Sequence, residues 1–231
     1  MKLLPVGRLS AALWAFSGLT CVAFQAPQNW EAVRAQEIAQ CLEGEISTWG
    51  DNRDRPAAQR HLVFAYRHSG APAWFDSSTV VSTLNRAAQA WSQCQVTASV
   101  SILEHSDTPP KNAILVQWSN TDSHRNFGLA NIGLNTLSIG PEAFQLLNKR
   151  NPTHDARTTL QMVISHEMGH FFGVMDHSKR CVDVTSYYHN GKGEQCLIRG
   201  GGAMPKGTEY RALLPTACDI QRCKAANGIQ Y

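Results

Sequence analysis

The chain has 231 residues, which is enough for one domain with a full hydrophobic core. Its formal net charge is +3, only 17% of its residues are charged, and Lys and Arg form no run. These features argue against a nucleic-acid-binding surface and against a polybasic membrane anchor. We therefore expect a globular monomer that binds neither nucleic acid nor a membrane.

The N-terminus has the pattern of a secretory signal peptide. Two basic residues precede an apolar stretch from Leu9 to Phe24, and polar residues interrupt this stretch. A membrane span would need about 20 consecutive apolar residues. We interpret residues 1–23 as a signal peptide that is cleaved after Ala23, with Ala26 as the alternative site. The mature protein is then expected to be secreted into an extracellular environment.

Removal of that segment leaves an even number of cysteines in an exported protein. They are Cys41, Cys94, Cys181, Cys196, Cys218 and Cys223. An even set in an oxidising compartment predicts three disulfides. The sequence alone does not fix the pairing, but proximity along the chain favours Cys181 with Cys196.

From residue 24 to residue 60 the sequence is polar and mixed, and we treat it as an N-terminal segment. It predicts a helix from Asn29 to Glu43 and a loop from Gly50 to Pro56. An amphipathic helix follows further on, because Asp76 can cap a stripe of apolar residues that ends at Trp91. Alternating or continuous apolar patterns predict strands at 61–66, 96–102, 113–118, 127–132 and 136–139.

From Thr158 the chain predicts a buried helix, because apolar residues occupy more than one of its faces. Within it, His166 and His170 are four residues apart, so both imidazoles lie on one face, as a zinc site requires. Glu167 lies about 100° around the helix and can act as a general base without ligating the metal. Two core histidines without a function are the alternative reading, but burying them beside a glutamate would be costly.

The turn after this helix offers a third ligand. Gly173 can adopt a positive φ and end the helix, so that the chain turns back toward the two histidines. Asp176 and His177 are the two candidates there. Three protein ligands leave zinc one open position, which is typical of a catalytic site. The residues alone therefore predict metal-assisted hydrolysis, in which Glu167 takes a proton from the attacking water.

The pattern HExxHxxGxx followed by a ligand resembles the signature of the metzincin zinc endopeptidases. The ending GVMDH is similar to that of the snapalysins, whose third ligand is an aspartate. This resemblance implies that the third ligand is Asp176, six residues after His170, whereas His177 would need one extra residue in the turn. It also implies a methionine turn below the metal, and the stretch 200–205 resembles that turn with Met204 as its methionine.

The order of predicted elements in residues 61–231 resembles the catalytic domain of the matrixins. The resemblance implies an α+β, metzincin-like fold: a twisted mixed β-sheet with a long backing helix and a buried metal-site helix. A loop-rich C-terminal subdomain would follow and end in a helix within Leu213 to Asn227. The implied activity is that of a secreted zinc endopeptidase, with a protein or peptide substrate bound in extended form along a sheet edge.

Three alternatives remain open. A catalytically inactive, metzincin-like binding module would normally have lost Glu167, which is present here. A zinc hydrolase that acts on a non-peptide bond is distinguished by a casein or gelatin digestion with and without a chelator. A latency segment in which Cys41 caps the zinc as a thiolate is disfavoured by the even number of cysteines.

Overall fold

The computed structural model describes residues 29–104, 107–201 and 207–229. The signal peptide expected at residues 1–23 and the methionine expected at Met204 lie outside the described residues. Within the described part, the chain forms a mixed α/β structure with five helices and one five-stranded sheet. No helix in that part is long and apolar enough to cross a membrane.

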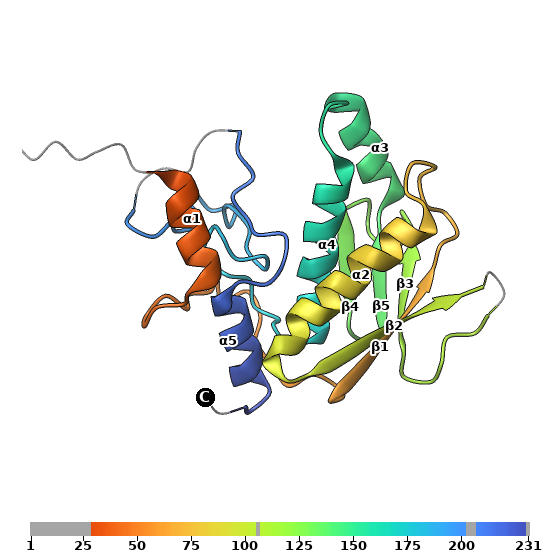
Figure 1. Cartoon of the computed structure of the whole chain (residues 1–231), viewed down its shortest axis with the longest axis horizontal. Helices are drawn as coiled ribbons and strands as arrows, with labels where there is room; N and C mark the ends of the chain where they lie inside the picture. The colour runs from red at the N-terminus through yellow and green to blue at the C-terminus, as the bar shows by residue number, and fades with distance from the viewer. Residues whose placement is uncertain (1–28, 105–106, 202–206, 230–231) are drawn as a thin grey trace, which may run out of the picture.

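The sheet is mostly parallel, with strand order β2-β1-β3-β5-β4 (Figure 1). Its strands are β1 (His61–Arg67), β2 (Thr97–Leu103), β3 (Ile114–Trp118), β4 (Gly128–Asn131) and β5 (Thr136–Ile139). The first three neighbouring pairs in this order are parallel, and β4 alone runs antiparallel, with Ala130 opposite Leu137. All five strands lie where the sequence predicts them. The antiparallel β4 forms one edge of the sheet, and this edge lies next to the candidate site described below.

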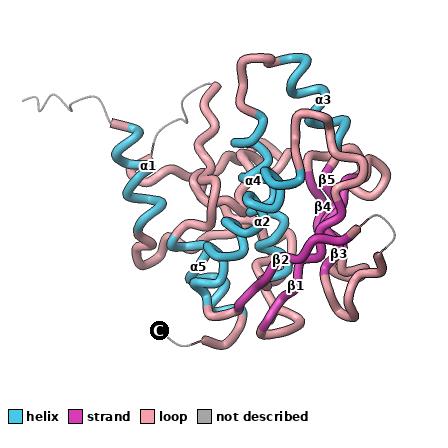
Figure 2. Tube along the Cα trace, turned by 45° about the vertical axis from the view of Figure 1, so that its right-hand side comes forward, coloured by secondary structure: helices cyan, strands magenta, loops and turns pink. Residues whose placement is uncertain are grey.

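The helices divide into two groups (Figure 2). They are α1 (Trp30–Ala39), α2 (Ser77–Trp91), α3 (Pro141–Arg150), α4 (Ala156–Phe171) and α5 (Ala217–Ala226), with a 3₁₀ turn at Ser92–Cys94. The first group, α2, α3 and α4, lies beside the sheet, whereas α1 and α5 lie among the loops on the other side of α2 and α4 (Figure 1). Asp76 caps α2 as expected, because its carboxylate accepts a 2.7 Å hydrogen bond from the Thr79 N–H.

The main core lies between the sheet and the helices α2 and α4. Trp91 is fully buried at the end of α2, and its indole Nε1 donates a 2.8 Å hydrogen bond to the carbonyl oxygen of Ser165 in α4. The two helices approach closely at Gly169, where a Cβ atom would lie 2.7 Å from the Trp91 ring. Phe64 of β1 stacks on Phe172 at the end of α4. These contacts fix α4 on the sheet.

Three disulfides hold the C-terminal loops and the N-terminal segment. The pairs are Cys41–Cys218, Cys94–Cys223 and Cys181–Cys196. The prediction of three disulfides is confirmed, and so is the pairing of Cys181 with Cys196. The alternative in which Cys41 caps a metal as a thiolate is wrong, because its sulfur is bonded to Cys218. Disulfides of this number are typical of proteins that fold in an oxidising compartment.

The N-terminal segment packs against the C-terminal part of the chain. Arg34 of α1 donates hydrogen bonds to the carbonyl oxygens of Tyr210 and Arg211, and the buried Glu37 accepts one from the Tyr210 hydroxyl. The segment before β1 is thus joined both covalently and by hydrogen bonds to the part of the chain that follows α4.

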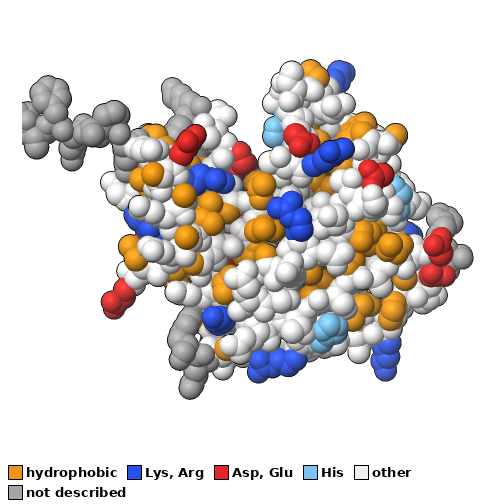
Figure 3. Space-filling model, in the orientation of Figure 1, with side chains coloured by type: hydrophobic (Ala, Val, Ile, Leu, Met, Phe, Trp, Pro, Cys, Tyr) orange, Lys and Arg blue, Asp and Glu red, His pale blue; other side chains and the backbone are white. Residues whose placement is uncertain are grey.

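Charged side chains are scattered over the face shown in Figure 3, and neither sign gathers in one large patch.

Candidate metal centre

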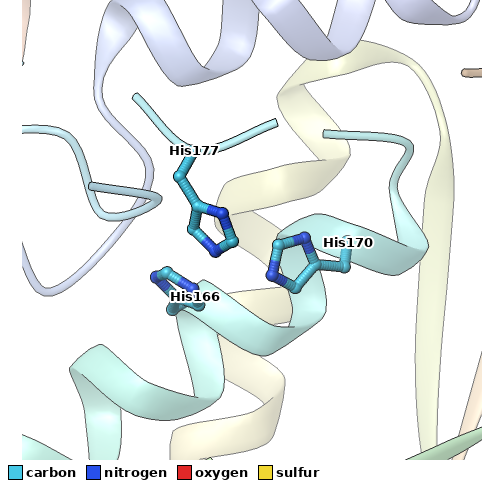
Figure 4. Close-up of side chains that lie close together, drawn as sticks. All are labelled: His166, His170 and His177. Carbon is cyan, nitrogen blue, oxygen red and sulfur yellow. The ribbon is translucent and has the colours of Figure 1, made fainter. Parts of the chain in front are cut away.

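Three histidines converge at the end of α4 (Figure 4). His166 and His170 lie one turn apart on this helix, and their ring centroids are 5.2 Å apart. His177 comes from the turn after the helix, and its ring centroid lies 5.1 Å from each of the other two. One ring nitrogen of each residue lies within 4.8 Å of the corresponding nitrogens of the other two. This arrangement can hold one metal ion.

Each of the three imidazoles has an oxygen partner at Nδ1. The contacts are His166 Nδ1 to the Val184 carbonyl, His170 Nδ1 to the Val174 carbonyl, and His177 Nδ1 to Asp51 Oδ2, each 2.8 Å. A carbonyl oxygen only accepts hydrogen bonds, so Nδ1 of His166 and of His170 must carry the proton. Nε2 is then left with its lone pair free. Metal-ligating histidines in proteins are held by such contacts at the second nitrogen.

The protein keeps these imidazoles in the form that ligates metals. Burial lowers the pKa of His166 well below its usual range, and it lowers the pKa of His170 to about 4. Burial also lowers the pKa of His177, although the nearby Asp51 carboxylate opposes this effect. All three side chains are therefore neutral at pH 7, as metal ligation requires.

Asp176, which the resemblance implies as the third ligand, does not join this group. Its carboxylate accepts a 3.1 Å hydrogen bond from the backbone N–H of Asp51. The backbone of the turn explains this orientation: the Asp176 N–H donates to Asp54 Oδ1, and the Asp176 carbonyl accepts from Arg222. With residue 176 fixed toward the N-terminal segment, residue 177 points to the helix. We therefore replace Asp176 with His177 as the candidate third ligand.

Glu167 lies between the histidines and the edge of the sheet. Its Oε2 accepts a 2.8 Å hydrogen bond from the Ala130 N–H of β4. Burial raises the pKa of Glu167 to about 7, although the Ala130 N–H opposes this rise. The strand contacts the helix closely here, because a Cβ at Gly128 would lie 2.8 Å from Glu167 Cγ. A carboxyl group with a pKa near 7 is well suited to take up and return a proton.

A cavity of about 920 Å³ opens beside the histidines and Glu167. Its apolar wall is built from β4, α3 and α4, with Phe127, Leu129, Leu146, Leu147, Met162 and Val163 among the lining residues. The elements predicted from the sequence do not include α3, a helix that buries Phe144 and packs the half-buried Leu147 against the core. The succession of Gly140 and Pro141 at its start is the signal that could have indicated it.

Asp51 and Tyr187 also belong to the site, and the sequence does not indicate them. The Asp51 carboxylate accepts hydrogen bonds from the backbone N–H of His177 and from the Tyr187 hydroxyl, in addition to its contact with the ring. The Tyr187 ring lies 4.1 Å from the His177 ring, measured between centroids. Asp51 is 126 residues from His177 along the chain, so no local spacing could have linked the two. Cys41 and Cys218 lie near Glu45 in a second group of ligand types, but their disulfide leaves no thiolate to bind a metal.

Comparison with known proteins gives no family for this chain. No protein-family model matches it, and no curated protein matches it. Among solved structures, a chain of the GM1-bound form of the ECX AB5 holotoxin aligns with 73% of this chain and 80% of that chain. The sequence identity is 10% and the TM-score is 0.41, and a likeness this low carries no argument about fold or activity.

Proposed function

We propose that this protein is a secreted zinc-dependent endopeptidase. In this proposal His166, His170 and His177 hold the zinc, and Glu167 is the general base. The observation that carries the proposal is the convergence of three neutral imidazoles, within 4.8 Å at their donor nitrogens, beside a buried glutamate and a large cavity. Secretion rests on the signal-peptide pattern at residues 1–23 and fits the three disulfides.

The donor set fits zinc. Three imidazole nitrogens are a common ligand set of catalytic zinc sites, in which a fourth position stays open. The oxygen partners at Nδ1 hold each ring in the tautomer that offers Nε2 to the ion. When bound, zinc lowers the pKa of a water molecule and polarises the carbonyl oxygen of the bond to be cleaved.

Glu167 supplies the proton transfers. Its carboxylate takes a proton from the attacking water and returns it to the leaving amine. The Ala130 N–H holds one carboxylate oxygen at the edge of β4, so the group is fixed next to the histidines rather than free in the cavity. With its pKa near 7, the side chain can exist in both protonation states during the reaction.

The edge strand β4 offers a place for the substrate backbone. Ala130 directs its N–H away from β5 and toward Glu167, which identifies the outer edge of β4 as the side that faces the site. An extended peptide can add to such an edge through backbone hydrogen bonds. The apolar wall formed by residues such as Leu129 and Val163 then suits an apolar side chain of the substrate.

We further propose a metzincin-like fold for this chain. The mixed sheet, the long helix α2 behind it and the helix α4 with both histidines fit the arrangement that the motif implies. The third ligand departs from the pattern by one residue, because His177 rather than Asp176 faces the other histidines.

The experiment that tests the function combines metal analysis with cleavage assays. Purified wild-type protein should contain one zinc per chain, digest casein, and lose this activity in a chelator. Glu167→Gln should keep the zinc and lose peptidase activity by about 10²- to 10⁴-fold, because it removes the general base. Glu43→Gln, on an exposed residue of the N-terminal segment, is the matched control and should retain full activity.

The outcomes separate the alternatives. Undiminished cleavage by Glu167→Gln would overturn the role of this residue. A wild-type protein that binds zinc but cleaves neither casein nor gelatin would point instead to a binding module or to a hydrolase of another bond. Absence of zinc from the wild-type protein would overturn the site itself.

A further inference from the structure

The segment from Trp49 to Arg55 lies across the turn that carries the third ligand. The Trp49 N–H donates a 2.9 Å hydrogen bond to the carbonyl oxygen of His177, and the Arg55 N–H donates a 3.1 Å bond to the carbonyl oxygen of Gly173. Both ends of the turn from Gly173 to His177 are therefore bound by the backbone of a segment that precedes β1.

Two carboxylates of this segment accept three consecutive backbone N–H groups of the turn. Asp54 Oδ1 accepts from Met175 at 2.8 Å and from Asp176 at 2.9 Å, and Asp51 Oδ1 accepts from His177 at 3.0 Å. If the two carboxylates were removed, these three N–H groups would lose their hydrogen-bond acceptors. The conformation of the turn thus depends on a part of the chain that is remote in sequence.

Asp51 holds the ring of His177 as well as its backbone. Oδ1 accepts from the His177 N–H while Oδ2 lies 2.8 Å from His177 Nδ1. The Tyr187 hydroxyl contacts both Asp51 Oδ2 and, at 2.7 Å, His177 Nδ1, and the Tyr187 ring packs against the imidazole. His166 and His170 are fixed by helix α4 and by backbone carbonyls, whereas His177 comes from a turn and is held by Tyr187 at its ring and by Asp51 at both its ring and its backbone.

We propose that Asp51 is a positioning residue for His177, and that the affinity of the site for zinc depends on it. One carboxylate fixes both the backbone and the ring of the ligand, so its loss lets the imidazole rotate away from His166 and His170. Removal of such a partner of a ligating histidine typically weakens metal binding by about 10- to 100-fold. This inference rests on the proposed zinc site and extends it to the N-terminal segment, which the Cys41–Cys218 disulfide ties to α5.

The test compares the zinc affinity of the mature wild-type protein with that of Asp51→Asn. Asparagine has nearly the same size but lacks the negative charge and the second acceptor oxygen. Zinc dissociation constants are measured by competition with a coloured chelator, and the expected change is a weakening of about 10- to 100-fold. Asp122→Asn, on an exposed aspartate whose carboxylate accepts a hydrogen bond from the Gln117 amide, is the matched control and should bind zinc like the wild type.

A second readout follows the ligand itself. In the metal-free protein, ¹⁵N NMR of the His177 ring should show the proton at Nδ1 in the wild type, and a mixture of tautomers in Asp51→Asn. A role of Asp51 in general stability alone would not change this signature in a folded variant. If Asp51→Asn does not fold, Asp51→Glu carries the test, because it keeps the charge and moves the carboxylate by one methylene; a weaker zinc affinity is expected there too.

Each outcome bears on one of the two proposals. Unchanged zinc affinity in a folded Asp51 variant, with an active wild-type enzyme, overturns the positioning role and leaves the endopeptidase proposal intact. Weakened affinity in Asp51→Asn, with a wild-type protein that cleaves no peptide, supports the positioning role and overturns the endopeptidase. A wild-type protein that binds no zinc overturns both.

Discussion

Gly173 lies directly against the backbone of Arg55: its φ is +102°, and a Cβ atom there would come within 2.2 Å of the Arg55 carbonyl oxygen. The Arg55 N–H also donates to the Gly173 carbonyl. The glycine therefore does more than end α4. It allows the N-terminal segment to approach the turn that carries His177.

We expect Gly173→Ala to lower the free energy of unfolding by about 2 to 4 kcal/mol, because it combines an unfavourable positive φ with a clash against backbone atoms. The variant should also bind zinc less tightly, since the segment that holds His177 must move. Gly44→Ala is the control: its φ is +78°, and nothing lies within 4 Å of the added Cβ. Thermal unfolding and zinc content measure both effects. Equal behaviour of the two variants would show that the contact with Arg55 has no energetic consequence.

His177→Ala should release zinc or bind it far more weakly, because it removes one of three ligands. Asp176→Asn should keep a full equivalent of zinc. Its side chain can still accept the hydrogen bond from the Asp51 N–H, and its carboxylate is not part of the histidine group. Zinc content of the two purified variants decides between the candidates. Loss of zinc in Asp176→Asn alone would restore the aspartate as the ligand.

The features that the sequence predicts well are those set by local spacing. The amphipathic stripe that ends at Trp91 predicts α2, and the separation of His166 and His170 predicts that both face one side of α4. The pairing of Cys181 with Cys196 is also local, at a sequence separation of 15. In each case the residues involved are close in the sequence, and they are also close in space.

The features that the sequence does not predict depend on contacts between distant segments. His177 rather than Asp176 faces the other two histidines, because Asp54 and Arg222 bind the backbone of residue 176 and so direct its side chain to the N-terminal segment. Asp51 joins the site from a loop far from His177 in the chain. The partner of Cys41 is likewise fixed only by packing of the N-terminal segment on α5. A motif can therefore locate a candidate site without defining every residue that forms it.

Trp91→Phe should destabilise the protein without removing the metal. The substitution deletes the buried hydrogen bond from the indole Nε1 to the Ser165 carbonyl and leaves a gap beside Gly169. The combined loss is about 2 to 3 kcal/mol, which corresponds to a fall in melting temperature of roughly 4 to 12 °C for a chain of this size. Trp74→Phe, at a tryptophan that is 41% exposed, should change the melting temperature little. A similar shift in both variants would argue against a special role for the Trp91 contact.

Gly128→Ala should reduce catalysis while zinc stays bound. A Cβ at this position would lie 2.6 Å from Val163 Cγ1 and 2.8 Å from Glu167 Cγ, so β4 and the glutamate side chain cannot both keep their places. Displacement of Glu167 also breaks its hydrogen bond with the Ala130 N–H, which holds the carboxylate at the strand edge. His166 and His170 belong to other positions of α4, and His177 belongs to the following turn. The geometry of the three histidines should therefore persist.

Gly133→Ala in the turn between β4 and β5 is the matched control for this substitution. Its φ is not in the left-handed region, and the added Cβ would meet only Asn131 Oδ1, at 3.6 Å. We expect Gly128→Ala to lower kcat by at least about 10-fold, because misplacement of a catalytic group by about 1 Å can cost up to 10²-fold. Gly133→Ala should retain the wild-type kcat, and both variants should contain one zinc per chain. If Gly128→Ala keeps the wild-type kcat, then the close contact between β4 and Glu167 does not position the general base.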